Sequence, residues 1–411
     1  MSRTPPGAAL AGARSRSALR SALRGAGAFA GVAGLGLLIG MGEYAASGGA
    51  YRLWTWVKVG SLYLVSFFGV GVRVDVGGRE LFLLRLPLMA GTVLAGWLLF
   101  RAGRRATGLR AWSAGWVVAG FVLPVWALAL PARLRFPDLG GAGVDATVHA
   151  IAWQALLFPA VFAAIVVAAG VVSGRAAGSS RAAAVRRIMA GGWRMTWLAL
   201  MFAFAGLLAV AAIHPGRAAE YGRWLGSQGR GGTLLVGHEL LAAPNAAFFA
   251  LAPAMGGATT VSGTAGARSV AASVRVSGVG PVAFLPPGNY PARDFGGIFY
   301  LLMLVPLAAT VTGGRFAATG ASHSGARVVR GAGAGLVFGM LITAGSVFAA
   351  VASPLSRAQL PIHVGVAMPA TALLAMAWGI GGGVLGALFA PQPAGVAPGE
   401  GAEPPLSPTS A

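Results

Sequence analysis

Long apolar runs, separated by short polar segments, dominate the pattern of this chain. A helix that crosses the hydrocarbon core of a bilayer needs about 20 apolar residues. Eight runs meet or approach that length: residues 25–42, 86–100, 111–132, 150–174, 195–213, 295–314, 331–353 and 364–391. The run 86–100 follows Arg85 directly, so it crosses only if residues 81–85 continue the helix and Arg85 snorkels or faces the bundle. The pattern predicts an all-α polytopic membrane protein with about eight transmembrane helices.

Two further apolar runs are too short for a comfortable crossing. Residues 59–72 are flanked by basic residues, and residues 240–255 contain Pro244 and Pro253. Proline interrupts the hydrogen-bond ladder of a helix, and broken backbone is tolerated at membrane depth where protein or water surrounds it. We therefore expect two short re-entrant or interfacial helices on the outer side.

Arginine is distributed unevenly between the polar segments. Segments 1–24, 101–110, 174–194 and 314–330 together hold 17 arginines and no acidic residue. Cytoplasmic loops carry an excess of basic residues, so these four segments are expected in the cytoplasm, with both termini on that side of the plasma membrane. Counting either short run alone as a crossing would export Arg-rich loops, which favours the re-entrant interpretation.

The composition agrees with this class and excludes several kinds of chemistry. Of 411 residues, 56% are hydrophobic and only 10% are charged, too few to cover a water-soluble core of this size. The absence of cysteine excludes disulfides and thiolate metal sites. The net charge of +21 comes from residues that flank apolar runs, so we expect anionic lipid headgroups as the partner and no nucleic acid. No cofactor motif is present, and no cofactor is expected.

The order of the segments repeats along the chain. It predicts a basic N-terminal segment, a first membrane unit, an Arg-rich linker, a second membrane unit and a disordered tail, at 1–24, 25–174, 175–194, 195–391 and 392–411. Residues 102–108 match residues 313–320, which lie at the corresponding place in the second unit. Because each unit has an even number of spans, the copies would be parallel repeats related by an axis along the membrane normal.

The most suggestive polar cluster lies on the second short segment. His238 and Glu239 precede its apolar part, and Asn245 follows Pro244 within it. Ionisable residues at membrane depth are candidates for function, so these three residues could line a polar cavity or bind a ligand. The alternative is that His238 and Glu239 lie in water at the outer interface. His149, with Asp145 one helical turn before it, gives two ligands and therefore no predicted metal site.

Glycines recur at intervals of four residues in the seventh run. Gly331, Gly335 and Gly339 would share one face of a helix, and small residues let helices approach closely in lipid. The pattern predicts a helix-packing face. No catalytic motif accompanies it, and no residue is assigned to catalysis.

Two stretches resemble a known group of proteins. The first runs from residue 57 to residue 108 and includes residues 69–72, 84–88 and 100–105. The second consists of residues 240–247 and 252–257. These stretches are similar to actinobacterial multi-pass membrane proteins of unknown function, a group that includes the PerM-like cell-division proteins and the streptophobe type. Ala243 departs from the leucine expected at that place. The resemblance implies a bacterial inner-membrane location and a role in the cell envelope, and it transfers no catalytic residue.

Three functions remain in contention. A non-enzymatic scaffold or regulator of the cell envelope, with membrane proteins as partners, is favoured because no span carries an acid or histidine near its centre. The alternative is a transporter or channel for a small solute, built from the two repeats. A lipid-modifying enzyme is the third, and only His238, Glu239 and Asn245 could supply its polar groups.

Overall fold

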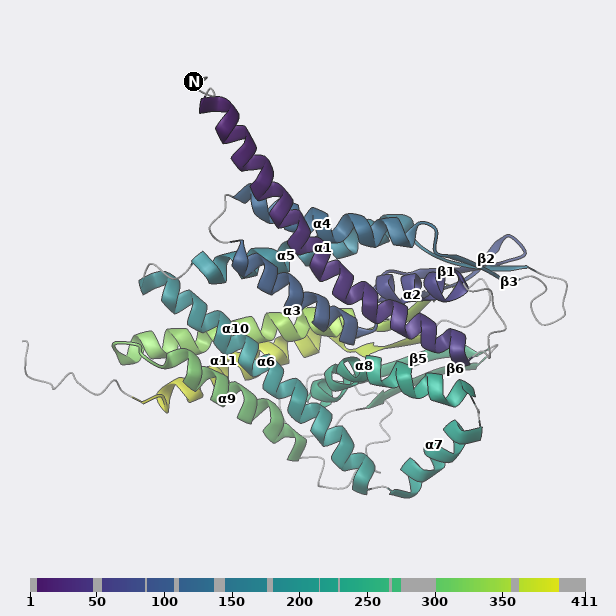
Figure 1. The fold of residues 1–411 in the computed structure, drawn as a ribbon. Coiled ribbons are helices and arrows are strands. Elements are labelled where there is room, and N and C mark those ends of the chain that lie inside the picture. The colour runs from purple at the N-terminus through teal and green to yellow at the C-terminus, as the bar shows by residue number, and fades with distance from the viewer. Residues whose placement is uncertain are drawn as a thin grey trace, which may run out of the picture.

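The computed structural model describes residues 6–46, 54–85, 87–106, 111–136, 145–175, 180–213, 215–227, 230–265, 268–274, 301–355 and 362–391. The helices form one bundle, and a β-sheet lies at its right-hand end in Figure 1. The helices are α1 (Pro6–Ala46), α2 (Trp54–Ser66), α3 (Met89–Arg105), α4 (Ala111–Ala129), α5 (Ala152–Arg175), α6 (Ser180–Ile213), α7 (Pro215–Ser227), α8 (Arg230–Ala254), α9 (Leu304–Ala318), α10 (Ser324–Ala349) and α11 (Met368–Leu388).

The strands join into one antiparallel sheet. They are β1 (Val72–Val76), β2 (Arg79–Arg85), β3 (Arg133–Phe136), β4 (Ala146–Ala150), β5 (Thr259–Ala265), β6 (Arg268–Val274), β7 (Val351–Leu355) and β8 (Ile362–Val366). Their order across the sheet is β3-β4-β1-β2-β7-β8-β5-β6. The first four strands come from the first half of the chain and the last four from the second half, so the β2–β7 pair is the seam between the halves.

The two halves have the same architecture. Each contains a long helix, a second helix that turns back into a hairpin, two further long helices, a second hairpin and a final helix, with α7 as an addition in the second half. In sheet order, β3, β4, β1 and β2 correspond to β7, β8, β5 and β6. The structure therefore contains two parallel repeat units, joined edge to edge.

Backbone hydrogen bonds repeat at matching positions in the two units. After α2, the N–H of Gly69 donates to Ser66 and that of Val70 to Val65. After α8, the equivalent bonds run from Gly256 to Pro253 and from Gly257 to Ala252. Gly69 and Gly256 have φ angles of 70° and 92°, which favour glycine because it lacks a Cβ. Both turns reverse the chain, so α2 and α8 are each followed by a strand that returns toward the same end (Figure 1).

The aligned glycines of the sequence match also occupy equivalent sites. Gly103 of α3 packs against the backbone of Val167 in α5, and Gly314 of α9 packs against that of Gly383 in α11. Within each of these helix pairs a Cβ has no space, because backbone atoms of the opposite helix lie against the glycine. The repeated segment therefore marks the same close helix contact in both units.

The prediction of a polytopic helical membrane protein is confirmed. Among the described residues, seven helices are long and apolar enough to cross a membrane: α1, α4, α5, α6, α9, α10 and α11. The helix α3, predicted as an eighth span, has 17 residues. Large apolar side chains remain exposed on the bundle, among them Ile165 at 65% and Leu373 at 71%. Such a surface suits lipid as the surrounding solvent.

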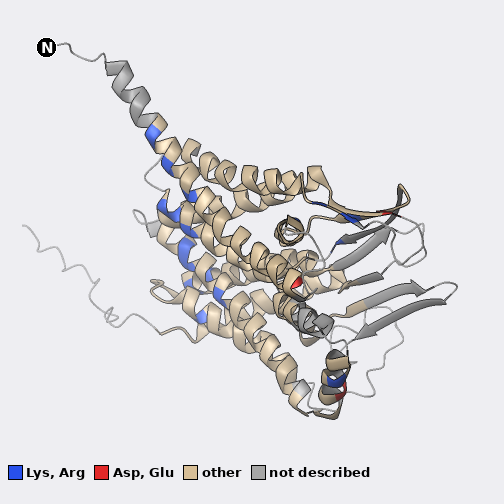
Figure 2. Cartoon of the chain, turned by 45° about the vertical axis from the view of Figure 1, so that its right-hand side comes forward, with Lys and Arg blue, Asp and Glu red and all other residues tan. Residues whose placement is uncertain are grey.

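Charged residues are sorted along the bundle. Figure 2 shows most described basic residues at the end away from the sheet, and acidic residues toward the sheet end. At the basic end, Arg24 donates to the carbonyl of Arg105 at 2.8 Å, and Arg327 donates to the carbonyl of Ala390 at 3.1 Å. Arg187 donates likewise to Thr319. These cations satisfy carbonyls at the C-terminal ends of α3, α11 and α9, where negative partial charge collects.

The structure corrects several local expectations. Residues 81–85 are part of strand β2 and do not extend α3. The stretch from Asp145 to His149 is extended, so these two residues are not one helical turn apart. Pro244 does not break its segment, because α8 runs continuously through it. Packing among neighbouring helices lets a helix tolerate an internal proline.

The predicted domain boundaries stay predictions. Residue 24 lies inside α1, and residues 180–194 lie inside α6, so neither boundary coincides with a helix end. The tail 392–411 lies outside the described residues.

Candidate functional site

Asn245 lies at the seam between the two units and is 3% exposed. Its Nδ2 donates to the carbonyl of Pro87 at 2.7 Å and to the carbonyl of Ala349 at 3.1 Å. Its Oδ1 accepts a hydrogen bond from the N–H of Met89 at 3.2 Å. Both amide protons of Asn245 and one lone pair of its oxygen are therefore used by backbone groups.

These partners lie at the ends of helices. Met89 begins α3 in the first unit, and Ala349 ends α10 in the second. The first N–H groups and last C=O groups of a helix have no partner within it. The Asn245 side chain on α8 therefore caps two helices from different units. We call Asn245 and its three backbone partners the joint between the units.

Apolar packing surrounds this joint. Met89 of the first unit lies in the hydrophobic core of the second, with Phe248 and Leu251 of α8. Leu241 and Ala242 of α8 pack in return against the core of the first unit. The side chains of α8 thus contribute to both cores, and they bury the polar joint from solvent.

His238 and Glu239 lie on α8, about two turns before Asn245. Their side chains lie outside the described part of the structure, so their candidacy stays a prediction. Gly237, immediately before them, has open space around its Cα.

Arg85, at the end of β2, is a half-buried cation that the sequence did not single out as a site residue. It faces Ala352 of β7 across the seam, and its guanidinium lies 5.7 Å from the centre of the Phe158 ring. Its Nε is buried and has no hydrogen-bond partner among the described residues. Burial lowers the pKa of Arg85 below the ordinary value.

The sheet brings together polar residues from separate strands. His149 Nδ1 lies 3.6 Å from an Asp75 carboxylate oxygen, and the register places His149 between Arg133 and Arg73. The acidic residue that pairs with His149 in the structure is therefore Asp75 of the neighbouring strand, and not Asp145 as the sequence suggested. Among the described residues, no group of three His, Asp or Glu side chains could hold a metal ion.

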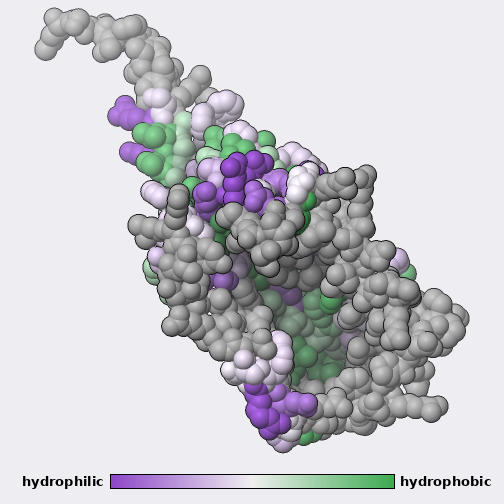
Figure 3. Space-filling model, turned by 90° about the vertical axis from the view of Figure 1, so that its right-hand side faces the viewer, coloured by the Kyte–Doolittle hydropathy of each residue, from purple (hydrophilic) through white to green (hydrophobic). Residues whose placement is uncertain are grey.

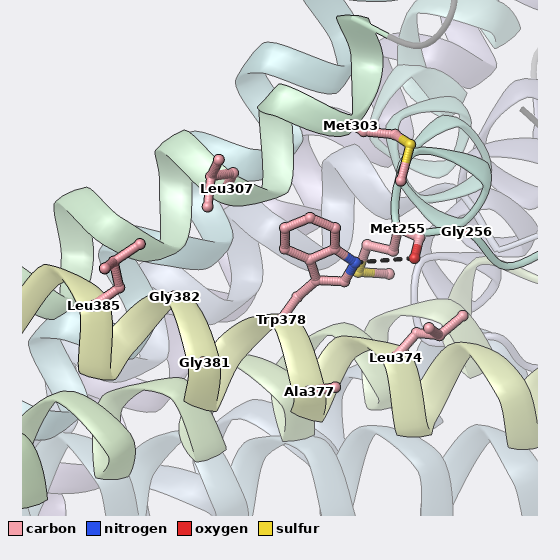
Figure 4. A pocket seen from close by; sticks show the side chains of 10 residues that line it. All are labelled: Met255, Gly256, Met303, Leu307, Leu374, Ala377, Trp378, Gly381, Gly382 and Leu385. Atoms are coloured by element: carbon pink, nitrogen blue, oxygen red, sulfur yellow. Dashed lines mark hydrogen bonds between the residues drawn. The ribbon is translucent and has the colours of Figure 1, made fainter. Parts of the chain in front are cut away.

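An apolar groove of about 330 Å³ opens between α9 and α11. Met303 and Leu307 line one side, Leu374 and Leu385 line the other, and Trp378 donates from Nε1 to the Met255 carbonyl at 2.9 Å (Figure 4). The equivalent place in the first unit holds Phe68 and Phe162, whose ring centres lie 5.6 Å apart. The groove offers an apolar surface, and its ten lining residues include no charged side chain.

The sheet-bearing end of the molecule is hollowed. Figure 3 looks onto this end, and the described surface inside the hollow is mainly hydrophobic. Most of the strongly hydrophilic surface visible in this view lies around the hollow.

The glycine face of α10 packs against α11. A Cβ added at Gly331 or Gly335 would overlap the backbone of Gly383 or Gly379, and one at Gly339 would overlap Met376. The helices therefore approach through backbone contact, as the spacing of four residues indicates.

Comparisons with protein-family models, with curated proteins and with solved structures each found no match to this chain.

Proposed function

We propose that this protein is a non-enzymatic scaffold or regulator in the bacterial cell envelope. The observation that carries the proposal is the geometry of Asn245. This residue is buried in the segment where the sequence predicts a ligand site. Its amide makes two hydrogen bonds to the backbone of the first unit and one to the backbone of its own unit. A group used in this way holds the fold together and is not available to a substrate.

The proposed orientation places both termini in the cytoplasm and the sheet outside. The sorting of charge along the bundle supports it. Anionic lipid headgroups are the proposed partner of the basic end, and membrane proteins are the proposed partners of the scaffold. The resemblance of residues 240–247 to PerM-like and streptophobe-type proteins supports an envelope role in a plasma membrane.

A transporter or channel is the second candidate. The hollow at the sheet end favours it, because a solute path needs an opening (Figure 3). Its mainly hydrophobic floor argues against a path for ions or polar solutes. A lipid-modifying enzyme would need converging polar groups, and the apolar groove brings none.

Complementation tests the scaffold proposal. Cells that lack the protein are given the double variant His238→Ala, Glu239→Gln, and their shape and resistance to detergent are compared with those restored by the natural chain. The scaffold proposal expects full restoration, because neither side chain has a chemical role in it. A loss of function at an unchanged membrane level of the variant would overturn the proposal in favour of transport or catalysis.

A variant of the joint supplies the matched control. Asn245→Leu is expected to restore function poorly and to show a reduced amount of folded protein, because it disrupts the seam. The comparison separates a structural defect from a chemical one.

A further inference from the structure

The outer sheet ends in two strands that are the counterparts of the seam strands. Within the described residues, β3 and β6 each have a hydrogen-bonded neighbour on one side only. In repeat order, β3 corresponds to β7 and β6 corresponds to β2. The edge strands of the described sheet are therefore the repeat counterparts of the two strands that pair at the seam.

The strand directions permit the same pairing again. Every neighbouring pair in the sheet is antiparallel, so strands four places apart run in the same direction. A β3 strand placed beside β6 in the manner of the seam would then be antiparallel to it. Open strand edges are templates for pairing with another chain.

We propose that β6 of one copy of this protein pairs with β3 of a second copy, repeating the β2–β7 seam between molecules. The contact does not depend on the proposed scaffold role. It joins different surfaces of the two copies, so it satisfies all edges only when the copies close into a ring, of which a dimer is the smallest.

Lys58, outside the sheet, is the first-unit counterpart of the residue that bonds across the seam. Counting from the equivalent turn glycines Gly69 and Gly256, Lys58 of α2 occupies the place that Asn245 occupies in α8. Asn245 donates across the seam to the carbonyl of Pro87. Lys58 also carries a donor, and it is exposed. A second copy would supply the neighbouring unit that Lys58 lacks within one chain.

The seam also fixes the expected register. In the seam, Arg85 faces Ala352. Leu84 and Val274 are equivalent in the two units, because each faces the first residue of the neighbouring strand, β1 or β5. Leu134 and Val351 are equivalent in the same way, because they face corresponding residues of β4 and β8. Transferring the seam register to the edges places Val274 of one copy opposite Phe136 of the next.

Cysteine cross-linking tests this pairing, since the natural chain has no cysteine. Two full-length variants, Phe136→Cys with one tag and Val274→Cys with another, are produced together and oxidised in the membrane. Pull-down on one tag and detection of the other measures disulfides between copies only. We expect about tenfold more linked product than from a matched pair in which Val74→Cys, in the inner strand β1, replaces Phe136→Cys, because disulfides need close Cβ atoms.

Controls make each outcome decisive. Leu83→Cys with Leu355→Cys in one chain should close a disulfide across the seam and shows that oxidation reaches the sheet. If that control closes and the mixed variants do not link, the proposal is overturned. Linkage of either single variant with itself would show a head-to-head contact, and a disulfide within one chain of the Phe136→Cys, Val274→Cys double variant would show that the sheet closes on itself. Either of these results also overturns the proposal.

Discussion

Asn245 shows how much of a site a single residue reveals. Its position after Pro244 in an apolar segment makes it a candidate to line a polar cavity, and in the structure its side chain is buried. Its partners, Pro87, Met89 and Ala349, are more than 100 residues away in sequence, so no local pattern identifies them. The same amide could line a cavity or cap two helices, and only the neighbouring backbone decides between these roles.

Asn245→Leu is expected to lower the free energy of unfolding by about 3 kcal/mol or more, because it leaves three backbone groups without this partner, at about 1–3 kcal/mol each. Thermal unfolding in detergent measures the change. Leu240→Ala, an exposed residue on the same helix, is the control and should alter stability by no more than about 0.5 kcal/mol. Equal stability of the two variants would show that the capping bonds contribute nothing.

At the scale of the elements, glycine spacing correctly predicts a helix contact, whereas the apolar runs predict helices but not the strands. Gly331, Gly335 and Gly339 lie against α11, as one face of a helix at intervals of four should. The strands are harder to predict, because β2 and β4 continue directly into apolar runs. A short apolar run has no periodicity that distinguishes strand from helix.

Gly335→Leu is expected to destabilise the protein by about 2 kcal/mol or more, because its side chain would occupy the place of the Gly379 backbone. Gly34→Leu is the matched control, since Gly34 lies in α1 with no atom near its absent Cβ. Unfolding of both variants in the same detergent checks the expectation. A stable Gly335→Leu variant would mean that α10 and α11 separate without cost.

The segment formed by α8 and β5 is expected to enter the membrane from the outer side and to return to the same side. Cysteines in place of Gly237 and Thr260 should both react with an impermeant thiol reagent added outside, because both positions are partly exposed. Gly257 is unsuitable, because it is buried against Ala252 and Thr371. Arg104→Cys, at the basic end, is the control that should react only after the membrane is opened. Protection of Thr260→Cys alongside labelling of Gly237→Cys would indicate a crossing.

At the scale of the molecule, the uneven distribution of arginine predicts orientation. Alkaline phosphatase fused after Arg110 or Arg330 should be inactive, because both positions follow segments expected in the cytoplasm. A fusion after Asp145, beside the sheet, should be active and serves as the control. Activity of either of the first two fusions would reverse the proposed topology.

The sequence by itself determined that this is a helical membrane protein and where most of its long helices lie. These properties follow from apolar runs, whose transfer into lipid depends on length and composition alone. Only the tertiary structure decided that β2 pairs with β7, that Asn245 joins the units, and that β3 and β6 lie at the two edges of the described sheet. Backbone groups carry no sequence signature of their partners, so their pairing depends on which distant edges the folded chain brings together.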